Sequence, residues 1–143
     1  MSVALPQDVQ AEQDLAAVAV MSCSGALAAV EVAGEVYDPR VRRIIDTAVG
    51  LPEGLEVDER VEMVAQTAGV PAIVLSAWVA ACPVMFDTSR ALRQRVHLAA
   101  INRERALALA AELEDLVGAP VEFAAPGWSE RPGSVMEVSE RAA

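Results

Sequence analysis

Hydrophobic and polar positions follow helical spacing along most of this chain, and the longest such stretch runs from Thr88 to Val117. It contains no glycine or proline and is rich in alanine, leucine, arginine and glutamate, which are strong helix formers. Asp87 or Thr88 is expected to cap its first turn, and Gly118 stands where a helix often ends in a left-handed residue. At about 45 Å, such a helix either projects beyond a small bundle or pairs with another helix.

Five shorter helices are predicted before the long one. The first starts at Val9 or Gln10 and is broken by Ser22–Gly25, and the others cover Ala26–Ala33, Arg40–Val49, Glu59–Ala68 and Ala72–Cys82. Asp38 and Pro39 have the residue types that begin a helix, and Asp58 is expected to cap the helix after it. Residues 72–82 are apolar nearly all round, which predicts a helix buried on every side. The fold class is therefore all-α, with a compact bundle of about five short helices followed by one long helix.

The composition changes after Gly118, where Pro and Gly recur too often for a long element. Val121–Phe123 is the one short piece in this region that is expected to be extended. We therefore divide the chain into a helical domain, residues 1–117, and a flexible or lightly docked tail, residues 118–143.

Hydrophobic residues make up 54% of the 143 residues, but aromatic residues only 3%, which predicts one domain with an aliphatic core. No apolar run reaches the roughly 18 residues that a membrane span needs. The first fourteen residues contain no Lys or Arg, unlike the start of a signal peptide. We expect a cytoplasmic protein without a membrane partner.

The chain contains no lysine, and its 11 arginines stand against 21 acidic residues, for a net charge of −10. A phosphate-binding loop of the GxxxxGK[ST] type and lysine Schiff-base chemistry are therefore excluded. Cys23 and Cys82 form no CxxC pair, and with His97 as the only histidine there is no zinc-type ligand set. The cysteines are expected to be small buried side chains and the histidine structural. The sequence predicts no catalytic residue, no cofactor and no metal, and so no enzyme.

The long predicted helix carries apolar side chains on two sides. One stripe comprises Leu92, Val96, Ala99, Ala100, Leu107, Ala110, Leu113 and Val117. Leu98, Ile101, Leu109 and Leu116 lie away from it. Such a helix must be covered on two sides: by its own bundle, and by the folded-back tail, a second copy or a partner helix. The predicted partner-binding residues are Arg93, Leu98, Ile101, Arg105, Leu109 and Leu116.

Eight of the arginines fall into two segments, residues 40–43 and 90–105. They could pair with neighbouring acids, as Arg103 and Arg105 flank Glu104, or orient an acidic protein partner, or contact DNA phosphates. The acidic net charge and the scarcity of aromatic side chains make nucleic acid the least favoured of the three.

In its order of features, the chain resembles the N-terminal domain of DnaB-type replicative helicases over about residues 5–117. The similar segments are Pro6 with Ala11-Glu12-Gln13-Asp14-Leu15, then Val36–Ile45, then Glu56-Val57-Asp58, and Ile101–Arg105 within the long helix. Two features depart from the family. Val41 or Arg42 occupies the place of a family histidine, and this sequence contains neither the motor domain nor the second hairpin helix.

The resemblance implies a divergent, stand-alone, non-catalytic module of DNA replication that acts through protein interaction. It would form a homo-oligomer, dimer or larger, and dock a replicative helicase or a primase, as the collar domain of the family does. Two alternatives stay open. The chain is a piece of a full replicative helicase whose ATPase domain lies elsewhere, or it is a small helical regulator that binds DNA through its arginine-rich segments.

Overall fold

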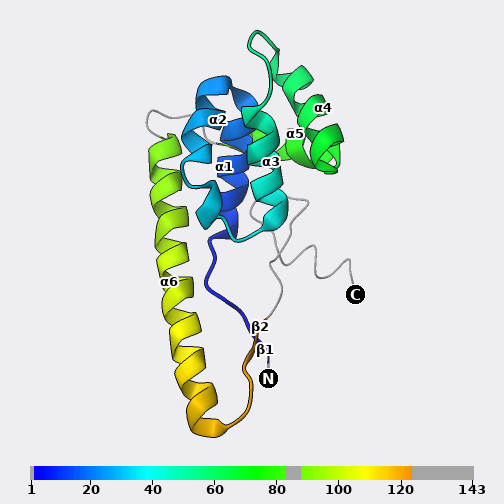
Figure 1. Cartoon of the computed structure of the whole chain (residues 1–143). Coiled ribbons are helices and arrows are strands. Elements are labelled where there is room, and N and C mark those ends of the chain that lie inside the picture. Colours follow the sequence, from blue (N-terminus) through cyan, green and yellow to red (C-terminus); the bar gives the residue numbers. More distant parts are fainter. Residues whose placement is uncertain (1, 83–87, 124–143) are drawn as a thin grey trace.

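The computed structural model describes residues 2–82 and 88–123, and these residues form a helical bundle with one long projecting helix (Figure 1). The helices are α1 (Val9–Met21), α2 (Cys23–Val30), α3 (Pro39–Val49), α4 (Val57–Ala68), α5 (Ala72–Ala81) and α6 (Thr88–Val117), with a short 3-10 helix, η1 (Ala33–Glu35). Two short strands, β1 (Ser2–Val3) and β2 (Glu122–Phe123), complete the described chain. The all-α prediction of a compact bundle followed by one long helix is confirmed.

Helix α1 lies at the centre of the bundle and packs against every other α-helix that the structure describes. Its side chains are buried around almost the whole circumference, from Leu15 and Val20 to four alanines. Alanine lets neighbouring backbones approach closely and costs no side-chain entropy in a helix. The core therefore forms around this one alanine-rich helix.

The junction between α1 and α2 is tighter than predicted. Ser22 alone leaves the helical conformation, with φ −159° and ψ 159°, and its hydroxyl accepts a hydrogen bond from the Gly25 amide at 3.0 Å. Because this cap brings Cys23 to Gly25 into the next helix, the predicted start at Ala26 was wrong. The predicted end at Ala33 was also wrong, since α2 ends at Val30. A Cβ atom on Gly25 would lie 2.1 Å from the Val18 carbonyl oxygen, so only glycine fits where α2 crosses α1.

Caps at the next two helices differ in how well they were predicted. Asp38 caps α3 as predicted, with Pro39 in its first turn, and its carboxylate accepts from the Arg40 amide at 2.9 Å. For α4, the cap is Glu56 rather than Asp58, and the Glu59 carboxylate accepts from the Glu56 amide at 3.2 Å. Glu56 and Glu59 form a capping box, in which the side chain of each accepts from the backbone amide of the other. The helix therefore starts at Val57.

The prediction that α5 is buried on every side was wrong. Val74, Leu75 and Trp78 are buried against α1 and α4, whereas Ile73 is 80% exposed. Ser76 is the one polar residue among the ten of α5, and it is exposed like Ile73. A single serine is too weak a signal to reveal that the helix lies at the edge of the bundle. No helix in the described part of the chain is both long and apolar enough to cross a membrane.

The long helix ends as predicted. Gly118 adopts φ +77° and donates from its amide to the Glu114 carbonyl at 2.7 Å. The chain then turns back, and Glu122–Phe123 pair in parallel with Ser2–Val3, which confirms the extended piece predicted at 121–123. The predicted cap at Asp87 and residues 124–143 of the predicted tail lie outside the described residues.

Candidate interaction surface

The first half of α6 lies against the bundle. It packs on α1, α2 and η1, and Leu92, Val96 and Ala99 are buried there. These three residues belong to the first predicted apolar stripe, and their spacing of three and four residues keeps them on one face of the helix. The stripe therefore holds the helix on the bundle only as far as about residue 103.

Charged side chains flank this buried stripe and bind the bundle. The Arg95 guanidinium binds the Asp8 carboxylate through two contacts, 2.8 and 2.7 Å long. Arg93 pairs with Glu31, and the His97 ring contacts Glu35. Arg93, Arg95 and the histidine thus have partners within the chain, but these partners lie far away in the sequence and are not the neighbouring acids.

Arg103 makes the last docking contact along α6. Its guanidinium donates to the Pro6 carbonyl at 3.2 Å and to the Glu35 carbonyl, and it stacks on the Tyr37 ring, 4.8 Å from the ring centre. One side chain therefore ties the helix to the N-terminal segment and to the loop before α3. Arg103 stands next to Glu104 in the sequence, which suggested a local ion pair and did not reveal this role.

Beyond Arg103, α6 leaves the bundle and projects from it (Figure 1). Leucines on both of the predicted stripes are exposed there. Leu107 and Leu113 belong to the first stripe, and Leu109 and Leu116, 65% and 84% exposed, belong to the second. A 14-residue helical segment without packing is marginal by itself, so its apolar faces are available to a partner that would also stabilise it.

Most of the predicted partner-binding residues share one outward face of α6. Leu98 is 59% exposed, Ile101 is partly exposed, and Arg105 is exposed, in line with Leu109 and Leu116. Arg93 does not join this face, because it turns toward α2 and pairs with Glu31. Leu98 also borders a shallow hollow between α6 and the N-terminal segment Pro6–Val9.

The tip of α6 is tied back to the N-terminal segment. The Val121 amide donates to the Glu114 carboxylate at 2.8 Å, and β2 then pairs with β1. In Figure 1 the segment before α1 runs down beside the projecting half and meets the returning chain at the strand pair. This connection limits the directions in which the projecting half can swing.

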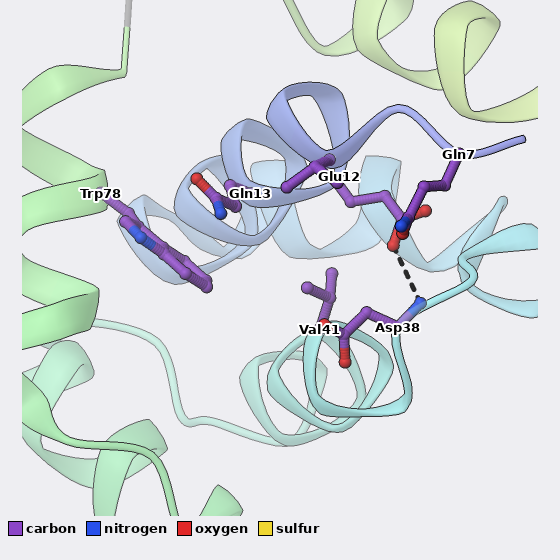
Figure 2. A pocket seen from close by; sticks show the side chains of 7 residues that line it. Gln7, Glu12, Gln13, Asp38, Val41 and Trp78 are labelled. Carbon is purple, nitrogen blue, oxygen red and sulfur yellow. Dashed lines mark hydrogen bonds between the residues drawn. The ribbon is translucent and has the colours of Figure 1, made fainter. Parts of the chain in front are cut away.

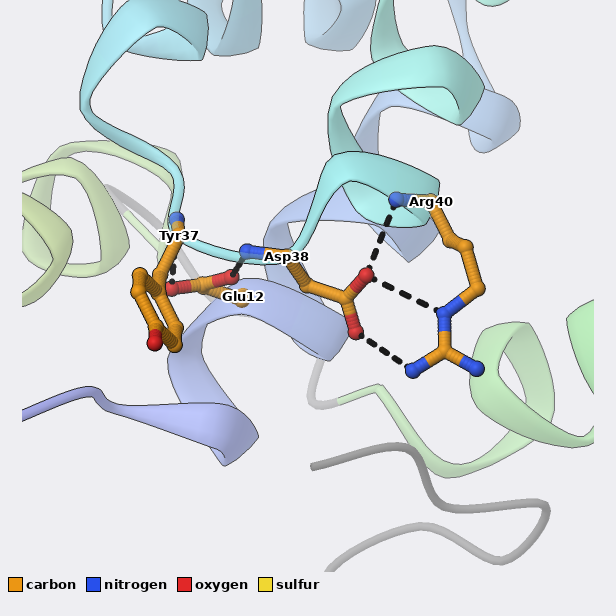
Figure 3. Close-up of polar contacts among 4 residues, drawn as sticks. All are labelled: Glu12, Tyr37, Asp38 and Arg40. Atoms are coloured by element: carbon orange, nitrogen blue, oxygen red, sulfur yellow. Dashed lines mark hydrogen bonds and ion pairs between the residues drawn. The ribbon is translucent and has the colours of Figure 1, made fainter. Parts of the chain in front are cut away.

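A second polar feature lies inside the bundle, and sequence reasoning missed it. The Glu12 carboxylate accepts hydrogen bonds from the Tyr37 and Asp38 amides at 3.1 and 3.0 Å, while Asp38 binds Arg40 (Figure 3). Burial raises the pKa of Glu12, although the two amides oppose this. The carboxylate thus holds the loop before α3, a role that no local sequence pattern indicates.

A small cavity lies beside this carboxylate. Side chains from α1, α3, α5 and the N-terminal segment line it, among them Gln7, Gln13 and Trp78 (Figure 2). Its volume is about 10 Å³, which is room for one water molecule and not for an organic substrate. The buried Gln13 Oε1 has no hydrogen-bond partner among the described residues, so a water here would satisfy it. The cavity is therefore a water-sized gap among the residues that line it.

Arg60 closes the other end of α1. It is almost fully buried and donates to the Val20 carbonyl at 2.6 Å and the Ala19 carbonyl at 3.1 Å, which are among the last carbonyls of that helix. It also contacts the sulfur of Cys23, which is half-buried, whereas Cys82 is buried as predicted. Arg60 lies outside both arginine-rich segments, and this role was not predicted.

The chain matches no protein-family model, and comparisons with curated proteins and with solved structures produce no match either.

Proposed function

We propose that this protein is a non-catalytic interaction module that self-associates through the outward face of α6. The observation that carries the proposal is the row of exposed apolar side chains at Leu98, Leu109 and Leu116 on a helix that extends past its own bundle. Large exposed apolar side chains that share one face are typical of sites where proteins associate. Burial of these side chains against a second helix supplies the free energy of association.

The arginines of α6 support a structural role more than a role in DNA binding. Arg93, Arg95 and Arg103 already bind acids and carbonyls of the same chain. A protein that binds DNA needs such side chains free to neutralise phosphates, and the net charge of −10 opposes that approach. The regulator that binds DNA through its arginines is therefore the weaker candidate.

The molar mass in solution tests self-association. Light scattering of the full chain is expected to give at least twice the 15.0 kDa of one chain at high concentration. The double variant Leu109→Glu, Leu116→Glu is expected to give the monomer mass and to keep most of its helical circular dichroism, because the bundle and the docked half of α6 stay folded. Both side chains are exposed in the single chain, so glutamate there removes association without disturbing the core.

Ile73→Glu is the matched control. Ile73 is as exposed as Leu116 but belongs to α5, on the other side of the bundle from α6 (Figure 1). This variant is expected to keep the mass of the unchanged protein. A wild-type chain that stays monomeric at all concentrations, or equal loss of mass in both variants, would overturn the proposal.

We further propose a replication partner, either a replicative helicase or a primase. This part rests on the resemblance of residues 5–117 to the helicase N-terminal domain, and the geometry of α6 is compatible with it. Co-sedimentation of the full chain with a purified helicase or primase from the same organism tests it. If neither protein binds wild type more strongly than the Leu109→Glu, Leu116→Glu variant, the proposed replication partner is wrong. The molar mass in solution then still decides whether the chain self-associates.

A further inference from the structure

We infer that the partner of α6 is a second copy of this chain, packed antiparallel along the outward face with a two-fold axis near Arg103 and Glu104. This inference rests on the proposed self-association and adds the orientation and register of the two helices. Three observations carry it: the division of charge along α6, the spacing of its exposed apolar residues, and the position of two exposed charges that have no ion pair within the described chain.

Charge is divided sharply along α6. Residues 88–103 contain four arginines and no acid, whereas residues 104–117 contain four acids and one arginine. An antiparallel pair places the basic half of each helix beside the acidic half of the other. A parallel pair places the two acidic halves side by side and Arg90 beside Arg90 of the other copy, which is unfavourable. The division therefore selects the antiparallel orientation.

The exposed apolar residues set the register. At about 100° per residue, Leu98, Ile101, Leu109 and Leu116 share one face of α6. When Leu98 of one copy lies opposite Leu109 of the other, the axis falls between Arg103 and Glu104, at the boundary between the two charged halves. Each pair then contains two Leu98–Leu109 contacts with Ile101 between them. Apolar spacing and charge thus agree on one axis.

The flanking charges fit the same register. Arg90 and Asp115 are exposed and lie on the same edge of the outward face, and neither forms an ion pair with any residue that the structure describes. In the inferred register, Arg90 of one copy comes beside Asp115 of the other, and this happens twice in each dimer. The remaining arginines of the basic half stay on their intramolecular partners.

The bundles do not obstruct this arrangement. Leu92, Val96 and Ala99 hold the bundle on the side of α6 away from Leu98 and Leu109. In an antiparallel pair, the bundles therefore lie at opposite ends, each against its own basic half.

Disulfide trapping in the full chain tests the orientation. Leu98→Cys and Leu109→Cys are each introduced into a chain with Cys23→Ser, because Cys23 is half-buried, whereas Cys82 is buried and is kept. Mild oxidation of the two variants mixed together is expected to give a covalent dimer at least tenfold faster than oxidation of either alone. In the inferred register, identical positions lie about 16 Å apart, too far for a disulfide.

Light scattering of the same samples tests self-association separately from the antiparallel register. A non-covalent dimer in which each single variant crosslinks to itself, and the mixture no faster, would overturn the antiparallel register and leave self-association intact. A monomer by light scattering with no crosslink in any sample would overturn both.

Charge reversal gives an independent readout. Arg90→Glu and Asp115→Arg are each expected to weaken dimerisation on the order of tenfold in Kd, because each change creates two like-charge contacts. The combination in one chain is expected to restore the wild-type Kd within about threefold. If the double variant dimerises no better than the single ones, Arg90 does not face Asp115.

Discussion

The guanidinium carbon of Arg103 lies 4.8 Å from the centre of the Tyr37 ring, where the long helix leaves the bundle. The same guanidinium donates to the carbonyls of Pro6 and Glu35. Three separate pieces of chain are thus joined at the point where α6 loses its packing. Arg103 separates a docked half of the helix from a half that is free to bind.

Replacing Arg103 by leucine is expected to lower the free energy of unfolding by about 2 kcal/mol, because it removes the stacking contact and two hydrogen bonds from a charged donor. Arg103→Lys is expected to recover little, since an ammonium group lacks the planar fork. Urea denaturation followed by circular dichroism measures the effect. Arg43→Leu is the control: Arg43 is exposed on α3, and its change is expected within about 0.5 kcal/mol.

Gly25→Ala is expected to destabilise the protein by about 2–4 kcal/mol, because the new methyl group would meet the Val18 carbonyl and push α2 away from α1. Gly34→Ala is the matched control. A Cβ atom there meets nothing within 4 Å among the described residues, so the change is expected to be neutral or slightly stabilising. Thermal unfolding of both variants gives the comparison, and equal midpoints would contradict the close α1–α2 approach.

Arg60→Met is expected to cost about 3 kcal/mol, because the Val20 and Ala19 carbonyls at the end of α1 lose their donors while the apolar volume is kept. Arg60→Lys is expected to restore less than half of the lost free energy of unfolding. One ammonium group cannot reach both carbonyls and Cys23 as the planar guanidinium does. Chemical denaturation is again the measurement. A neutral effect of methionine would mean that water satisfies the carbonyls.

Glu12 is expected to make stability depend on pH. Its pKa is raised in the folded protein by burial, from the ordinary value of 4.5. Between these two pKa values the folded state binds more protons than the unfolded state, so the free energy of unfolding falls as pH rises, by at most about 1.4 kcal/mol per pH unit. Below the ordinary value the group is protonated in both states, and this contribution is fully present.

Glu12→Gln isolates this contribution. The amide accepts only one of the two backbone hydrogen bonds, so the variant is expected to be less stable by about 1–3 kcal/mol at pH 4. The difference from wild type is expected to shrink toward pH 7, because only wild type loses stability as Glu12 ionises. Urea denaturation across this range measures it. A difference that grows with pH would show that the two amides outweigh the burial of the charge.

Much of the fold could be predicted from local sequence signals. The long helix, the Asp38–Pro39 start of α3 and the glycine end at Gly118 depend on residues close together in the chain, and each was predicted correctly. The outer face of α5 was missed because its run of apolar residues has no periodic polar position. The start of α2 was missed because Ser22 acts as a cap and not as part of a loop.

The contacts that dock α6 could not be predicted in the same way. Arg93 and Arg95 bind acids that lie 62 and 87 residues away, and residues 88–103 contain no acid that could have suggested a local partner for either. The outward face with Leu98, Leu109 and Leu116 was foreseen, because helical spacing alone places these residues together. The length of the projecting half was not foreseen, because it depends on where the bundle ends.

The central position of α1 also has a consequence for synthesis on the ribosome. This helix emerges before every element that covers it, and it depends on α6, the last helix described, for part of its packing. At about 5–20 residues per second, its apolar sides stay uncovered for several seconds while the rest of the chain is translated. The packing of α1 is therefore complete only after α6 has been made, and until then part of its apolar surface can associate with other chains.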